Sequence, residues 1–133
     1  MVTELPTDIY LNVFQFIAHG HNGKYGDKIP ALFITKSYSI QDFLVYSAVN
    51  GDRNYNRYYN FVLGRWYHFA IKQYEDMGKY FFEVIIDDVS LGKIENSDTQ
   101  NFPKVKLFAS NPWDESFSSR FGNVCNFRIV GAS

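Results

Sequence analysis

The residues best suited to ligand binding lie in one polar stretch, Asn50 to Asn60, which reads Asn-Gly-Asp-Arg-Asn-Tyr-Asn-Arg-Tyr-Tyr-Asn. Its Asn-Gly start predicts a tight hairpin turn, and we expect the rest, which lacks aliphatic residues, to be a loop. Sugars present apolar ring faces edged by hydroxyl groups, so their sites pair an aromatic ring with amide, carboxylate or guanidinium groups. Surfaces rich in Tyr and Asn also bind proteins. The candidate ligand-binding residues are Asp52, Arg53, Asn54, Tyr55, Arg57 and Tyr58, together with Trp113 in a second loop.

Both candidate regions also have a structural explanation. The 50–60 stretch could be a solvated hairpin whose tyrosines pack back onto a sheet, and Trp113 could close the edge of the core. Sequence patterns alone leave these alternatives open.

A catalytic carboxylate pair is the second possibility. Glu83 and Asp87 project from the same face of one expected strand, four residues apart. That spacing corresponds to about 13 Å, whereas the two carboxylates of a glycosidase lie about 5–5.5 Å or 6.5–9.5 Å apart. No phosphate-binding glycine loop or serine nucleophile motif occurs either. We therefore expect a non-enzymatic protein, with a glycoside hydrolase as a remote alternative.

Metal ligation has weak support in the sequence. His19, His21 and His68 could supply three zinc ligands, but they lack a zinc-site spacing and a cysteine partner. Calcium needs several oxygen ligands, and no spacing resembles a dedicated calcium loop. The available carboxylates are Asp27, Asp52, Asp87, Asp88 and Asp114.

Composition predicts a single soluble domain. The chain has 133 residues, 46% hydrophobic, with no apolar run long enough to span a membrane. A formal charge of −1 disfavours a nucleic-acid partner. The single cysteine excludes an intrachain disulfide, and the N-terminus does not resemble a signal peptide, so the compartment stays open.

About eight strands with turn signals between them predict an all-β sandwich or barrel. In one expected strand, the alternate residues Tyr80, Phe82, Val84 and Ile86 share one face, which is predicted to be the inner surface of a sheet. Cys125, in the last expected strand, is predicted to face inward and to be inert. The other expected strands are 9–17 (with Ile9, Leu11, Val13 and Ile17 on one face), 31–35, 43–49, the hairpin within 64–94, 104–109 and 123–130.

Three segments resemble the laminin-G-like, concanavalin A-like jelly-roll family. They are Gly64 to Ile71, with its Trp and His before alternating apolar residues, Val84 to Leu91, and Gly122 to Ile129. Asp88 stands where that family more often has Gly. The resemblance implies that residues 1–133 form a single domain, an antiparallel two-sheet β-sandwich of jelly-roll type. Domains of this family are often extracellular, and they bind glycans or proteins and sometimes Ca²⁺.

The functional expectation is therefore a lectin-like or adhesion module that binds a carbohydrate or an extracellular protein. The alternative, from a different class, is a structural domain that forms homo-oligomers through exposed sheet edges and tyrosines.

Overall fold

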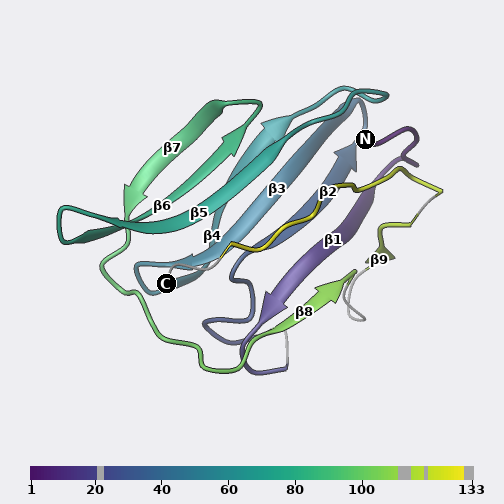
Figure 1. The fold of residues 1–133 in the computed structure, drawn as a ribbon. Coiled ribbons are helices and arrows are strands. Elements are labelled where there is room, and N and C mark those ends of the chain that lie inside the picture. Colours follow the sequence, from purple (N-terminus) through teal and green to yellow (C-terminus); the bar gives the residue numbers. More distant parts are fainter. Residues whose placement is uncertain (21–22, 111–114, 119, 131–133) are drawn as a thin grey trace.

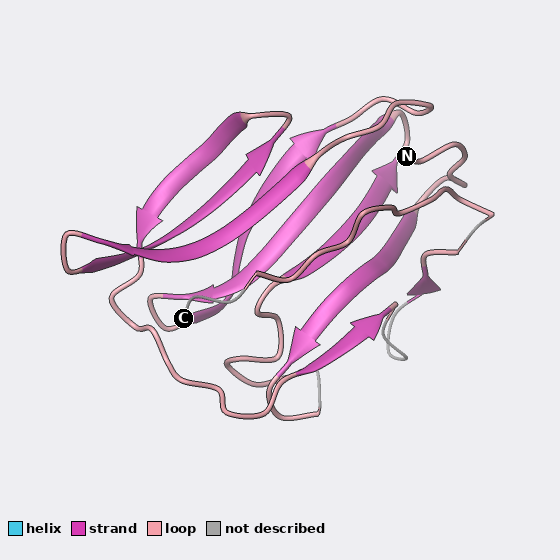
Figure 2. Cartoon of the chain, viewed as in Figure 1, coloured by secondary structure: helices cyan, strands magenta, loops and turns pink. Residues whose placement is uncertain are grey.

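A computed structural model of the chain describes residues 1–20, 23–110, 115–118 and 120–130. These residues form strands and loops without any helix, arranged in two layers (Figures 1 and 2). The strands are β1 Ile9–Ile17, β2 Ala31–Ser37, β3 Ile40–Val49, β4 Asp52–Asn60, β5 Phe69–Asp76, β6 Lys79–Ile86, β7 Val89–Glu95, β8 Lys106–Ala109 and β9 Glu115–Ser116. The predicted all-β, two-sheet sandwich is confirmed.

The larger sheet has the strand order β4-β3-β2-β1-β8, and all neighbours in it are antiparallel. The short strand β9 adds a parallel pairing to β1 that the sequence did not suggest. The smaller sheet is an antiparallel meander with the order β5-β6-β7.

Tight turns connect the hairpins. Asn50 and Gly51 both have positive φ, of 53° and 79°, between β3 and β4, which confirms the predicted Asn-Gly turn. Asp87 and Asp88, with φ of 50° and 64°, make the equivalent turn between β6 and β7. Turns with two positive φ angles match the right-handed twist of the paired strands. Asp88 is therefore in a glycine-like conformation, which Asp tolerates better than most residues.

The core lies between the two sheets and is rich in aromatic rings. Phe43 of β3 stacks on Phe61 at a centroid distance of 4.0 Å and meets Phe69 of β5 edge-on at 4.8 Å. The predicted inner face of β6 is confirmed for Phe82, Val84 and Ile86, which are all buried, but it does not extend to Tyr80, which is 44% exposed near the start of the strand.

A β-bulge in β1 changes which of its residues face the core. The pairing with β2 shifts between Asn12 and Phe14, so alternation reverses at that point. Phe14 therefore packs against the core cluster, whereas Gln15 does not belong to it. Ile17 is buried outside that cluster, so its predicted grouping on one face with Ile9 and Leu11 was wrong.

The predicted closing strand over 123–130 was also wrong. This segment forms no strand, although residues next to it pair with the N-terminus through the Val2–Gly122 bridge. Cys125 is exposed, contrary to its predicted inward position. The segment runs as a loop over the part of the larger sheet that the smaller sheet leaves uncovered (Figure 1).

Candidate functional site

The stretch predicted as a recognition loop is strand β4, at the edge of the larger sheet. Its residues therefore point alternately to opposite faces of the sheet. Tyr55 and Tyr59 are partly buried against the core, and Arg57 is half-buried between them. Tyr58 is 69% exposed on the other face. The six candidate residues on this strand therefore cannot form one continuous ligand surface.

Several polar side chains of β4 cover the backbone of their own strand edge. The Asp52 Oδ1 accepts from the Asn54 N–H at 2.8 Å, and the Asn56 Nδ2 donates to the Asn54 carbonyl at 3.1 Å. The Arg57 Nη1 donates to the Asn56 carbonyl at 3.1 Å. Unpaired edge groups invite pairing with another chain. The Asn- and Arg-rich composition thus has a structural use, which is to occupy edge groups that an incoming strand would need.

Tyr55 belongs to the interior of the sandwich. Its ring meets Phe82 of the smaller sheet edge-on at 5.8 Å, and the Arg57 guanidinium lies 4.6 Å from its centroid. Its hydroxyl is buried and has no hydrogen-bond partner among the described residues. Burial raises the pKa of Tyr55, and the nearby Arg57 partly opposes this rise. Tyr55 is thus a packing residue rather than a ligand contact.

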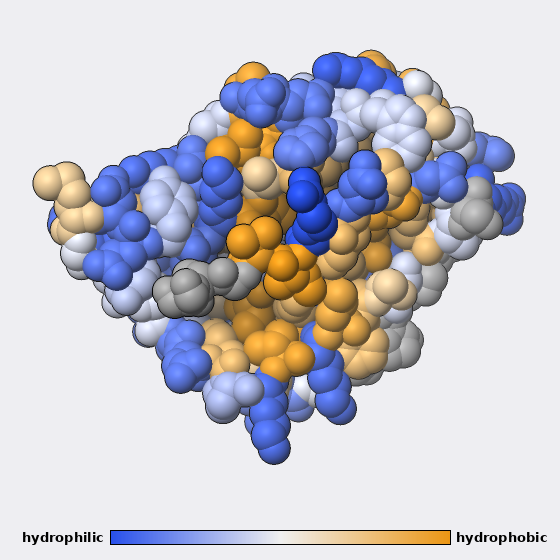
Figure 3. All heavy atoms as spheres, viewed as in Figure 1, coloured by the Kyte–Doolittle hydropathy of each residue, from blue (hydrophilic) through white to orange (hydrophobic). Residues whose placement is uncertain are grey.

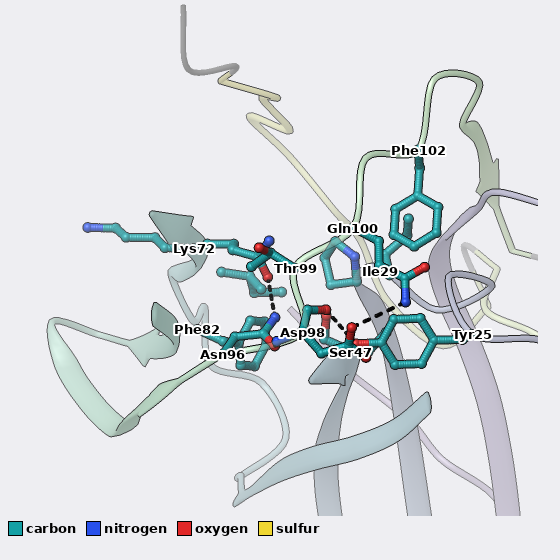
Figure 4. Close-up of a pocket in the computed structure, with 14 residues that line it drawn as sticks. Tyr25, Ile29, Ser47, Lys72, Phe82, Asn96, Asp98, Thr99, Gln100 and Phe102 are labelled. Atoms are coloured by element: carbon teal, nitrogen blue, oxygen red, sulfur yellow. Dashed lines mark hydrogen bonds between the residues drawn. The ribbon is translucent and has the colours of Figure 1, made fainter. Parts of the chain in front are cut away.

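A cleft of about 200 Å³ opens between the two sheets at one end of the sandwich (Figure 4). Its floor comes from the end of β3, from β5 and from Phe82, and two loops, 23–30 and 96–102, form its rim. The side chains of Tyr25, Gln100 and Phe102 gather on one side of it, whereas Lys72 extends away (Figure 4). The cleft therefore combines three aromatic rings, two at the rim and Phe82 in the floor, with amide, carboxylate and hydroxyl groups.

Two of the predicted ligand residues lie beside this rim. Asn54 accepts a hydrogen bond from Nζ of Lys28 at 3.1 Å, and Lys28 also lies 4.8 Å from the ring centroid of Tyr46. Asp52 lies close enough to Tyr25 to help raise its pKa. Asp52 and Asn54 are thus near the cleft without lining it.

A network of amides fixes the geometry of the cleft. Asn96 is 2% exposed, and its Oδ1 accepts from the backbone N–H groups of Asn50 at 3.0 Å and Asp98 at 3.2 Å. Its Nδ2 donates to Gln73 Oε1 of β5 at 3.0 Å. The Asn50 side chain in turn binds the Ser97 N–H at 2.7 Å and the Glu95 carbonyl at 2.9 Å. These bonds join the β3–β4 turn of one sheet to β5 and β7 of the other.

Tyr25 and Phe102 are held against each other's loops. The Tyr25 hydroxyl donates to the Asp98 carbonyl at 2.9 Å. Burial is the main cause that raises the Tyr25 pKa, so its phenol stays protonated and remains a donor at neutral pH. Gly26 has a φ of +98°, and a Cβ there would lie 2.5 Å from the Phe102 ring. Only glycine at this position lets the two rim loops approach.

The catalytic and metal candidates are dispersed or already engaged. Asp87 lies in a turn, where it accepts from Arg65 at 2.7 Å and from the His68 N–H at 2.9 Å, while Glu83 accepts from the Tyr74 hydroxyl at 3.0 Å. Asp27 is buried and accepts from the backbone of His19 and Lys24. In the described part of the chain, no three His, Cys, Asp or Glu side chains gather as a metal site would require.

Sequence reasoning recognised both rim loops as loops but did not connect them. Three-dimensional proximity joins Tyr25 to Phe102 across more than seventy residues, and no short motif marks such a pair. The available signal was the glycine-rich composition of residues 19–28. Trp113, His21 and Asp114 lie outside the described residues.

Comparisons with known proteins leave the fold and site as the only guides to function. The chain matches no family model, and no curated protein or solved structure matches it. The described residues contain no helix that could cross a membrane.

Proposed function

We propose that this protein is a non-enzymatic, lectin-like recognition module that binds one sugar unit of a glycan in the cleft at the end of the sandwich. The observation that carries the proposal is the side-by-side placement of the Tyr25 and Phe102 rings with the Gln100 amide at a cleft between the sheets. Aromatic rings contact the apolar face of a sugar, and amide or carboxylate groups bind its hydroxyls.

The size and electrostatics of the cleft favour a small neutral polar ligand. Pockets for drug-sized ligands occupy roughly 300–1,000 Å³, so the 200 Å³ here suits a group about the size of one sugar ring. The Asp98 carboxylate accepts a hydrogen bond from the Gln100 amide at 3.5 Å. Because this hydrogen bond is long, a hydrogen bond from a bound hydroxyl could readily replace it. Lys72 extends away from the cleft, so a strongly anionic ligand is less favoured (Figure 4).

Other features agree with recognition rather than catalysis. The carboxylates Glu83 and Asp87 are engaged by Tyr74 and by Arg65, away from the cleft lining. The resemblance of residues 64–71 to laminin-G-like domains supports the same class of function and an extracellular location, whereas residues 122–129 add no support, because the closing strand that they resemble does not form.

A glycan array followed by calorimetry tests the proposal, with calcium and again with a chelator. Gln100→Ala and Phe102→Ala should each weaken binding, because one loses a hydrogen-bonding amide and the other a ring face. Loss of about 1.5 kcal/mol of contact energy corresponds to roughly tenfold in affinity. The control is Tyr58→Ala, which removes an exposed ring from β4, outside the cleft lining.

Binding that survives both cleft variants but is lost in Tyr58→Ala would move the site to the outer face of β4 and contradict the proposal. A folded protein that binds no glycan would also contradict it. Light scattering over a range of concentrations would then test the self-assembly alternative.

A further inference from the structure

A second cavity lies between the uncovered part of the larger sheet and the C-terminal segment. The smaller sheet contacts β3 and β4 through the Phe43–Phe69 and Tyr55–Phe82 ring pairs. Beside β1 and β8, the C-terminal part of the chain encloses a cavity of about 460 Å³, and from that part the lining residues are Phe117, Ser118, Gly122, Asn123, Val124 and Phe127. Figure 3 shows hydrophobic residues gathered in the middle of the molecular surface on the side seen in Figure 1. This cavity shares no lining residue with the sugar cleft.

The lining is mostly apolar, and its polar members are Ser110, Ser118 and Asn123. Among the described residues, its larger side chains come from both walls: Val13, Phe14, Leu107, Phe117, Val124 and Phe127. Ser110 also lines it, but its hydroxyl is occupied by the Asn12 and Phe117 carbonyls at 2.9 and 3.0 Å. No charged side chain takes part in this lining, so the cavity favours a ligand whose enclosed part is a hydrocarbon.

Among the described residues, the C-terminal segment has backbone hydrogen bonds to the rest of the chain at one end only. Residues Gly122 and Asn123 pair with the N-terminus, including a bond from the Asn123 N–H to the Met1 carbonyl at 2.8 Å. Beyond them, no backbone hydrogen bond among the described residues involves 124–130. Phe127 meets Phe14 edge-on at 5.2 Å and is 45% exposed. A narrow chain can therefore enter beneath this segment without breaking a sheet.

The charge near the cavity is positive. Residues 104–130 include four basic residues, Lys104, Lys106, Arg120 and Arg128, and two acidic residues, Asp114 and Glu115, which gives a net charge of +2, although the whole chain carries −1. Such a local excess attracts an anionic head group.

We propose that this cavity binds the hydrocarbon chain of a fatty acid, whose carboxylate stays at the basic surface. The cavity volume lies within the usual range for ligand pockets, about 300–1,000 Å³. The proposal is independent of the sugar cleft, so either can fail alone.

The test titrates the full-length protein with 11-(dansylamino)undecanoic acid and follows the dansyl fluorescence. We expect saturable binding to one site and displacement of the probe by laurate but not by butyrate. Ala109→Phe should lower the affinity at least tenfold, because Ala109 lines the cavity. The matched control is Ala70→Phe on β5. Ala70 faces outward, because it lies between Phe69 and Ile71, which pack against the core. The affinity of this variant for the probe should equal that of the wild type.

If Ala109→Phe does not fold, Val124→Trp narrows the cavity from the C-terminal segment instead, because Val124 lines it and is 55% exposed. Absence of saturable binding, or equal affinity in the folded cavity variants and the wild type, would overturn the proposal. Sedimentation that shows a dimer excluding the probe would assign this face to a second copy of the chain and would overturn it as well.

Discussion

The amide of Asn96 offers the sharpest test of how the two sheets are held together. Its side chain is 2% exposed and accepts from the N–H groups of Asn50 and Asp98 while donating to Gln73. Asn96→Ala removes all three bonds at once. It leaves two backbone donors without their acceptor at the junction between the sheets.

The expected loss of stability in Asn96→Ala follows from the desolvation of these two backbone donors. A buried donor that loses its partner costs about 1–3 kcal/mol. Both bonds to Asn96 Oδ1 are only partly buried, so water can reach the donors in part and the lower half of that range applies. Two donors then give a loss of about 2–4 kcal/mol, a large share of the roughly 5–15 kcal/mol that stabilises a typical domain.

Urea denaturation at neutral pH measures this loss, with fluorescence of the two tryptophans as the signal. Asn96→Asp is the informative comparison, because it keeps the acceptor for both N–H groups and the Gln73 amide can rotate to donate. We expect Asn96→Asp to lose clearly less stability than Asn96→Ala. Gln100→Ala, in the same loop but exposed, should change stability by less than about 0.5 kcal/mol. A loss below about 0.5 kcal/mol for Asn96→Ala would show that the network does not join the sheets energetically.

Three further changes test other parts of the structure. Tyr55→Phe removes a buried hydroxyl that has no partner among the described residues, so it should raise the free energy of unfolding by about 1 kcal/mol in urea denaturation. Burial raises the Tyr55 pKa, so above about pH 10 the unfolded chain loses the phenol proton before the folded chain does, and the free energy of unfolding falls. This alkaline fall in stability should be smaller in Tyr55→Phe than in the wild type. An equal fall in both proteins would contradict the burial of the Tyr55 hydroxyl. Replacing both Asn56 and Arg57 by Val uncovers the edge of β4, so light scattering should report faster aggregation than in Tyr58→Ala, and equal rates would refute edge protection. Gly26→Ala places a Cβ 2.5 Å from the Phe102 ring, at a residue whose φ is +98°. It should therefore lower the free energy of unfolding, measured in urea, by about 1–2 kcal/mol and weaken ligand binding. Stability and affinity equal to those of the wild type would show that the rim loops adapt to the added methyl group.

Local patterns in the sequence were enough for most strands. Alternation in Phe82, Val84 and Ile86 correctly predicted a buried face, and the Asn50–Gly51 pair correctly predicted a hairpin turn. Such features depend on neighbouring residues alone, so a sequence records them directly. The first strand was predicted at its observed bounds, but its bulge reversed the faces after Asn12. A bulge depends on pairing with β2, and no local pattern in β1 reveals it.

The candidate site was largely beyond sequence reasoning. Composition suggested a recognition loop at 50–60, yet those residues form an edge strand whose side chains alternate between faces and cover its own backbone. Segment 123–130 has the alternation of a strand but forms none, because strand formation also needs a partner edge in register.

The sequence by itself determined the class of fold, because apolar alternation and turn residues act over a few positions. Only the tertiary structure decided which residues far apart in the sequence meet. It brought Tyr25 and Phe102 together at one cleft, placed Asn96 between the sheets, and left the cavity under the C-terminal segment. The physical reason is that these contacts depend on how the two sheets pack and how far the smaller one reaches, which is a property of the whole chain.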